Sequence, residues 1–260
     1  MLTAIGPKST KESSSRMAVS DVTPSSQTVA IRPPEYWPRL AYMALVQAAD
    51  RFILADTFQY SRQSFQNRTR LRNPQGWQWI SVPLKGGQHG TDIQDVRLRH
   101  HLPWQRTHHR ALRYNYRTTP FYPYMEERLH ALLERDWTRL GALTCETVEV
   151  LSDALGLDTP IIRASTLPGA PASVPEVLDA IEPATLMVPE PVAEIDAEHA
   201  PRTDVLCFEH PTYRQNFDGF ERGMSALDLI LNYGPEAARM LARAAHVAPA
   251  SELRTRANTG

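Results

Sequence analysis

The spacing of apolar residues along the first part of the chain predicts alternating strands and helices. TVAIRPP and RFILAD are apolar runs of strand length, and the apolar residues of the intervening PRLAYMALVQAAD recur at helical spacing. Two strands joined through a helix favour parallel pairing, because the helix supplies the crossover that parallel strands need. We therefore expect an α/β fold in which helices flank a central, mostly parallel sheet.

The rest of the chain also shows both the alternation of strands and the spacing of helices. GWQWISVPL and TDIQDVRLR alternate as half-buried strands do, and PIIRAS and DVLCFEH are further strand-like runs. Residues 104–155 follow the helical period in three pieces, which predicts a helical insertion.

Glycine and proline mark the expected helix ends. Gly156 follows the last periodic residue of the insertion and fits a position just past a helix C-terminus. Gly234 and Pro235 interrupt a periodic run near the C-terminus, so one helix should end there and a second should begin.

Composition divides the chain into one domain and its flanks. Residues 1–28 hold few large apolar side chains and predict a disordered leader, and residues 248–260 predict a frayed tail. Residues 29–247 should form a single domain. Within it, residues 166–202 hold seven prolines and little periodicity, which indicates a flexible connector.

The charge of the chain is distributed unevenly. The net charge is −1, but residues 57–117 hold eleven Lys and Arg against two acids, a local charge of +9. The remainder must then carry −1 − 9 = −10. Such asymmetry indicates an anionic partner.

Several classes of protein find no support. The chain has no P-loop, no dinucleotide-binding glycine fingerprint and no GxSxG motif, and its histidines lack the spacing of a metal site. No apolar stretch has the length of a membrane span or a secretory signal. The two separated cysteines, Cys145 and Cys207, fit buried, reduced thiols. We expect a cytoplasmic protein and leave any cofactor open.

Four blocks of sequence carry a resemblance to a known family: PPEYWPRLAYM, ADRFILADTFQYSRQSFQNRTRLRNPQGWQWISVPL, WQRTHHRALRYNYRTTPFYPY and HPTYRQNFDGFERGMSALDLILNYGPEA. In this order they resemble the motifs of the WbqC-like family, bacterial proteins often associated with O-antigen and other surface-polysaccharide gene clusters. The resemblance implies transfer of a glycyl or similar group to a sugar. The chain departs from the family at Pro33 and Thr69, and it holds the proline-rich segment where the family has a stretch like GAxxYLSGP.

The segment QNRTRLR is the first candidate for binding. Arg68 and Arg70 offer planar donor forks that suit phosphate or carboxylate, and Asn67 suits a sugar hydroxyl or a carbonyl. An ordinary solvated loop is the alternative, and the surplus of basic residues nearby favours anion binding. Trp77 and Trp79, which follow, are expected to be scaffold with a face in the core.

His108 is the candidate general base. On a helix it shares a face with Trp104 and Leu112, so burial and neighbouring arginines would lower its pKa and leave a neutral imidazole. A packed structural histidine is the alternative, and both interpretations stay open.

The last candidates lie near the C-terminus. Ser225, Asp228 and Asn232 fall at spacings of three and four, on one face of an apolar helix. Solvent exposure would explain them, and Ser225 would also serve as an N-cap. The preceding loop offers Tyr213 and Gln215.

The expected site is the sum of these groups and the remaining residues that match the family. Its catalytic residues are His108 and Asp228, and its substrate-binding residues are Tyr36, Asp56, Tyr60, Asn67, Arg68, Arg70, Tyr213, Gln215, Ser225 and Asn232. The function that this set implies is transfer of a small acyl or amino-acyl group to a phosphate-linked sugar, with an anionic small molecule or a lipid-linked sugar as partner. The alternative is a non-catalytic or degenerate protein that binds phosphorylated glycan or nucleic acid; of the two, nucleic acid is the less expected ligand.

Overall fold

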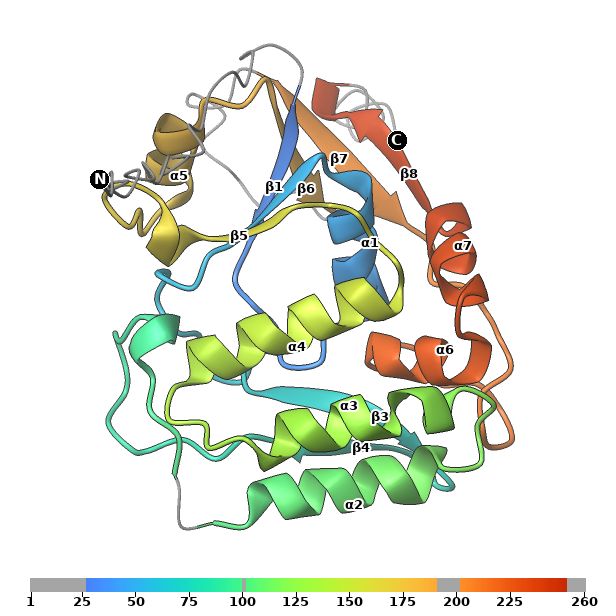
Figure 1. Ribbon diagram of the computed structural model, residues 1–260. Helices are drawn as coiled ribbons and strands as arrows, with labels where there is room; N and C mark the ends of the chain where they lie inside the picture. Colours follow the sequence, from blue (N-terminus) through green and yellow to red (C-terminus); the bar gives the residue numbers. More distant parts are fainter. Residues whose placement is uncertain (1–26, 100–101, 191–201, 252–260) are drawn as a thin grey trace, which may run out of the picture.

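A six-stranded sheet forms the centre of the computed structural model, which describes residues 27–99, 102–190 and 202–251 (Figure 1). Its strands lie in the order β5-β2-β1-β6-β7-β8, and every neighbouring pair is parallel except β7 with β8. Their bounds are β1 (Thr28–Arg32), β2 (Arg51–Leu54), β5 (Ile161–Arg163), β6 (Thr185–Pro189), β7 (Thr203–Phe208) and β8 (Ala245–Pro249). The expected α/β fold with a mostly parallel sheet is confirmed.

Alternate residues of the strands bury against helices on the two faces of the sheet. Ala30, Phe52 and Leu206 belong to the larger core, which includes side chains of α1 (Leu40–Ala48), α4 (Leu140–Ala154), α6 (Ala226–Tyr233) and α7 (Glu236–Arg243). Val29 and Ile53 point to the opposite face and pack with α5 (Val174–Ile181). Among the described residues, no helix has both the length and the apolar character needed to cross a membrane.

A separate hairpin and the expected helical insertion lie below the sheet in Figure 1. The hairpin consists of β3 (Arg68–Asn73) and β4 (Gly76–Ser81), and the insertion consists of α2 (Trp104–Tyr116), α3 (Tyr122–Glu134) and α4. Leu71 of the hairpin, Leu112 of α2 and Leu143 of α4 belong to the same core as α1. The insertion and the hairpin therefore pack on the main body through one continuous core.

The carboxyl ends of the first two strands lead toward the hairpin. The loop after β1 bonds to the segment before β3 through the Tyr36 amide and the Phe65 carbonyl, at 2.9 Å. The strand order reverses beside β1, with β2 on one side and β6 on the other. Ligands of open α/β sheets bind outside the carboxyl ends of strands at such a point.

The expected connector at residues 166–202 is corrected by the structure. Its described part, up to residue 190, contains helix α5 and strand β6, and β6 is an inner strand of the sheet. The prolines mark element boundaries here: Pro175 lies in the first turn of α5, and Pro189 is the last residue of β6. Residues 191–201 lie outside the described residues.

Three smaller expectations also change. TDIQDVRLR forms a 3-10 turn at Ile93–Asp95 and isolated bridges where a strand was expected. RTRLRN, for which a solvated loop was the alternative to an anion-binding segment, is β3. Residues 245–249 form the edge strand β8 where the expected frayed tail begins; the expected leader at 1–26 and the end of the tail at 252–260 lie outside the described residues.

Candidate anion-binding site

Tyr60 and Asn67 form the wall of a pocket at the start of the hairpin. The Tyr60 hydroxyl donates to Asn67 Oδ1 at 3.1 Å, and Asn67 Nδ2 donates to the Val82 carbonyl at 3.1 Å. The Val82 amide donates back to the Asn67 carbonyl at 2.7 Å, which extends the β3–β4 pairing by one residue. The side chain of Asn67 is thus fixed in orientation from two sides.

A glycine-rich loop, Lys85–Gly90, forms the opposite wall. The Gln88 side chain holds it in place by donating to the Lys85 and Arg97 carbonyls and accepting from the Arg97 amide at 2.6 Å. Gly87 and Gly90 have φ of +72° and +78°, a region that side chains disfavour. Within the described residues, nothing accepts from the amides of residues 86–89. Such free amides in a glycine-rich turn suit an anion.

The pocket between these walls is strongly basic. It has a volume of about 470 Å³ and is lined by Tyr60, Arg62, Asn67, Val82, Pro83, Leu84, Lys85, Gly86, Gly87, Gln88 and His89. Two of these side chains are fixed cations, one is a histidine and none is an acid. An anion would therefore find positive charge and amide donors at one place, whereas a metal cation would find no carboxylate ligand.

The positive charge around Tyr60 affects the pKa of its hydroxyl. Partial burial raises the pKa of Tyr60, and Arg62 and Arg68 oppose that rise because they favour the phenolate. The hydroxyl accordingly stays protonated at neutral pH and acts as a donor. Arg68 lies outside the pocket lining but contributes to its positive potential.

Arg68 and Arg70 lie on the outer face of the hairpin, stacked on tryptophans. The Arg68 guanidinium is 4.3 Å from the Trp79 ring, and that of Arg70 is 4.3 Å from Trp77 and 4.9 Å from Trp79. Trp77 is 39% exposed, so the expectation that it packs in the core is wrong. The two indoles instead hold the arginines side by side through cation–π contacts.

His108 and Tyr36 form a buried pair beneath the hairpin. His108 is 3% exposed and Tyr36 is fully buried, and the Tyr36 hydroxyl lies 2.8 Å from His108 Nδ1. Burial lowers the pKa of His108 to about 4, although a hydrogen bond to the Ser81 backbone opposes this. Burial also raises the pKa of Tyr36, which keeps the hydroxyl as the donor. The imidazole is neutral, as expected, but burial lowers its pKa without the expected contribution of the arginines, and both of its nitrogens are engaged.

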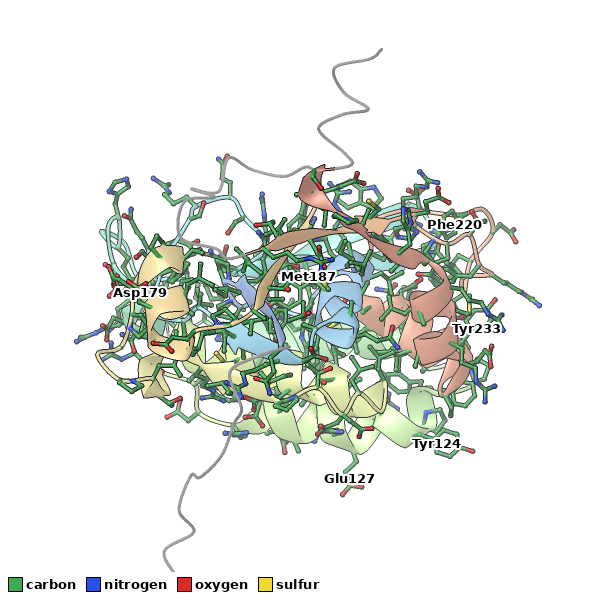
Figure 2. All side chains as sticks on the ribbon, turned by 90° about the horizontal axis from the view of Figure 1, so that it is seen from above. Tyr124, Glu127, Asp179, Met187, Phe220 and Tyr233 are labelled. Atoms are coloured by element: carbon green, nitrogen blue, oxygen red, sulfur yellow. The ribbon has the colours of Figure 1, made fainter. Side chains whose placement is uncertain are left out.

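Asp228 lies at the centre of a second buried network. Its Oδ2 accepts from the Tyr213 hydroxyl at 2.8 Å and from Gln215 Nε2 at 2.9 Å. Gln215 Oε1 in turn accepts from Arg72 Nε at 3.1 Å. Burial raises the pKa of Asp228, and its hydrogen bonds and Arg72 oppose this rise. Figure 2 shows Tyr233 and Phe220, the ring neighbours of Tyr213, on the side of the molecule opposite α5.

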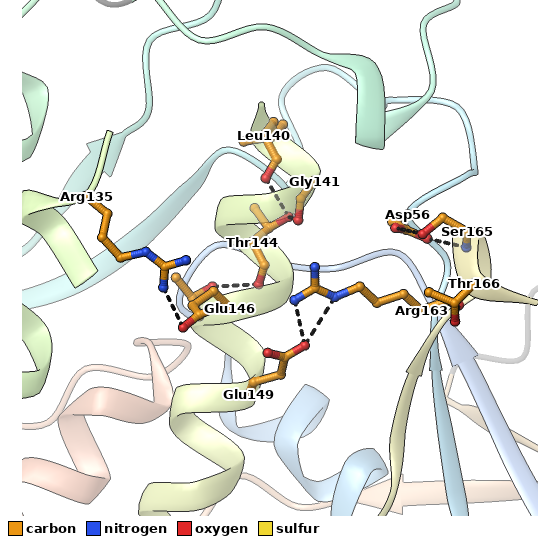
Figure 3. Close-up of polar contacts among 11 residues, drawn as sticks. Asp56, Arg135, Leu140, Gly141, Thr144, Glu146, Glu149, Arg163, Ser165 and Thr166 are labelled. Carbon is orange, nitrogen blue, oxygen red and sulfur yellow. Dashed lines mark hydrogen bonds and ion pairs between the residues drawn. The ribbon is translucent and has the colours of Figure 1, made fainter. Parts of the chain in front are cut away.

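The remaining predicted residues make local contacts. Asp56, just after β2, accepts from the amide and the hydroxyl of Ser165 at 2.9 and 2.6 Å and so ties the ends of β2 and β5 together (Figure 3). Ser225 caps α6 by accepting from the Leu227 amide, as expected. Asn232 donates to the backbone carbonyl of Asp228 one turn earlier.

The structure thus brings the predicted residues together in separate groups along the hairpin. Tyr60 and Asn67 line the basic pocket, Tyr36 and His108 lie under the adjoining end of β4, and the Asp228 network surrounds Arg72 near the hairpin turn. Sequence reasoning missed Arg62, Lys85, His89 and the glycine-rich loop. The signal was the run KGGQHG directly after a strand, a place where free amides and cations can gather.

These features define an α/β protein with a preformed basic pocket, and comparison places it in a family. The model of the WbqC-like protein family matches residues 33–240, and the chain belongs to that family. The chain is also similar to the uncharacterized protein Rv1507c of Mycobacterium tuberculosis, with 30% identity over 220 residues, which cover 80% of this chain and 95% of that protein. No solved structure matches the chain.

Proposed function

We propose that this protein binds a phosphate-linked sugar in the Tyr60–Asn67 pocket and transfers a small acyl or amino-acyl group to it. The observation that carries the proposal is the pocket itself, which combines Lys85, Arg62, free loop amides and no acid. Lys85 and Arg62 would hold the phosphate, and the loop amides would complete its coordination. Tyr60 and the amide of Asn67 would contact the sugar.

The chemistry requires a base for the acceptor and an activated acyl ester as donor. The acceptor hydroxyl or amine attacks the acyl carbon, the new C–O or C–N bond forms, and the bond to the carrier breaks. A base takes the acceptor proton and returns it to the departing carrier. Orientation of the two substrates in one pocket supplies part of the acceleration.

We assign the base to His89, which lines the pocket and is exposed to solvent. His108, the base expected from the sequence, is 3% exposed and already bonded on Nδ1, so a positioning role for the Ser81–Val82 backbone suits it better. Asp228 likewise suits a structural role, because the network around it is buried.

Gene deletion tests the transfer. In the organism that encodes the protein, deletion should lower the mass of a surface glycan by one acyl or amino-acyl group, and the wild-type gene should restore it. A gene carrying His89→Ala should not restore the mass, whereas His89→Gln tests whether a neutral side chain suffices. An unchanged glycan mass after deletion would rule out transfer, and full restoration by His89→Ala would rule out His89 as the base.

A further inference from the structure

A stripe of arginines follows the solvent face of α2. Arg106, Arg110, Arg113 and Arg117 recur at spacings of four, three and four residues, which places them along one side of the helix. All four are exposed, α2 contains no acid, and the stripe covers about 16 Å of helix. A surface helix commonly alternates acids and bases for solubility, so an unmixed stripe requires another explanation.

Contacts between α2 and the hairpin show which end of the arginine stripe lies toward the basic pocket. Near the start of α2, His108 bonds to the Ser81 backbone, one residue before the pocket-lining Val82. Near its end, the Tyr116 hydroxyl accepts from the Arg72 amide at 2.9 Å, close to the hairpin turn. The helix therefore runs along the hairpin, and its Arg106 end lies toward the basic pocket.

A hollow accompanies the stripe between α2 and β4. It has a volume of about 600 Å³ and is lined by Gln78, Thr107, Arg110, Ala111, Arg113, Tyr114 and Arg117. Arg113 has a long contact of 3.9 Å to Glu126. Among the residues that the structure describes, no carboxylate pairs with Arg110 or Arg117.

We propose that this groove binds the chain of a linear acidic glycan whose phosphate-linked end occupies the Tyr60–Asn67 pocket. The inference rests on the proposed function and extends it from a single sugar to an oligomer with several anionic groups. The arginines would pair with successive carboxylates or phosphates, and Gln78, Thr107 and Tyr114 would bond to sugar hydroxyls. A hollow along a helix suits a chain better than a flat membrane surface.

The aromatic side chains favour a glycan over single-stranded nucleic acid. Nucleic acid requires successive exposed rings on which its bases stack. Trp104 is buried, and arginines stack on Trp79 and on Trp77, which is 39% exposed but lies outside the groove lining. Within the lining, Tyr114 supplies the exposed ring. The lining offers instead the guanidinium groups of three arginines and the polar side chains of Gln78 and Thr107.

Binding of acidic oligosaccharides of defined length tests the proposal. Calorimetry with galacturonic acid oligomers of one to eight units should show affinity that rises with length and falls with salt. In the double variant Arg110→Ala/Arg117→Ala, the affinity for the octamer should fall about tenfold, while the affinity for inorganic phosphate stays unchanged. Arg239→Ala is the matched control, since Arg239 is also exposed but lies on α7 and pairs with Glu236.

Two outcomes would overturn the proposal. One is an octamer affinity that does not depend on length or on Arg110 and Arg117. The other is preference for an oligothymidylate of equal charge, which would identify the groove as a nucleic-acid site. If the proposed function itself is wrong, inorganic phosphate does not bind to the wild type. This result distinguishes failure of the proposed function from failure of the groove proposal.

Discussion

The Tyr36–His108 pair shows how one hydrogen bond can connect distant parts of the chain. The two residues are 72 positions apart and join the loop after β1 to α2 and, through Ser81, to β4. The His108 imidazole must be neutral, because its Nδ1 accepts a hydrogen bond from the Tyr36 hydroxyl. Protonation of Nδ1 would break this bond and leave a buried charge. The pair therefore links the stability of the protein to pH.

The first prediction concerns acid stability. The pKa of His108 is about 4 in the folded protein, and its ordinary value is 6.5. Because the unfolded chain binds a proton more readily, the stabilisation is complete above pH 6.5 and is lost as the pH falls toward 4. The free energy of unfolding that is lost with the protonation of His108 amounts to roughly 3 kcal/mol.

Urea unfolding at pH 7.5 and pH 4.5 measures this effect. The wild type should lose more free energy of unfolding between these values than His108→Gln, whose amide offers one donor and one acceptor without titrating. Comparison of the two proteins removes the contributions of the other histidines and of Asp228. Equal losses in both proteins would contradict the assignment.

Part of this residue-scale account could be predicted from the sequence. The spacing of His108 from Trp104 and Leu112 correctly indicated a buried, neutral imidazole. Its partner could not be found, because Tyr36 reaches it only through the packing of separate elements. The same limit hid the stacking of Arg70 on Trp77, which depends on the register of β3 with β4.

At the scale of elements, the junction between α6 and α7 depends on a single glycine. Gly234 has φ of +52°, and a Cβ atom added there would lie 2.3 Å from the Phe121 ring. The close approach lets α6 pack against the start of α3, where the Phe121 amide donates to the Leu231 carbonyl at 3.0 Å. Here the sequence signal of glycine followed by proline predicted both helix ends.

The second prediction concerns this glycine. Gly234→Ala should lower the free energy of unfolding by more than about 2 kcal/mol, because it combines backbone strain with a clash against a ring. Gly86→Ala is the control, since an added Cβ there meets nothing within 4 Å. Thermal unfolding of both variants provides the measurement, and equal melting temperatures would contradict the role of Gly234.

Strands proved harder to predict than helices, for physical reasons. β6 is buried on both faces and carries no alternation, and the prolines around it suggested a connector. β3 does alternate, but two of its alternating positions, Arg68 and Arg70, are arginines that stack on tryptophans of the partner strand. In each case the evidence for a strand lies in a neighbouring strand and not in the segment itself.

At the scale of the molecule, the charge imbalance found in the sequence becomes two basic surfaces on one hairpin. The pocket lies at the open end of β3 and β4, and the α2 groove runs along them toward the turn. The sheet and the insertion fix the hairpin between them through the common core. The hairpin that carries both surfaces is therefore anchored by packing on two sides.

The central claim is that the Tyr60–Asn67 pocket binds phosphate, and calorimetric titration with inorganic phosphate and pyrophosphate tests it most directly. The wild type should bind both, and Lys85→Ala and Arg62→Ala should each weaken binding about tenfold without changing the melting temperature, since both side chains are exposed. Arg239→Ala should bind as the wild type does. Absence of binding to the wild type, or equal affinity in all four proteins, would contradict the account.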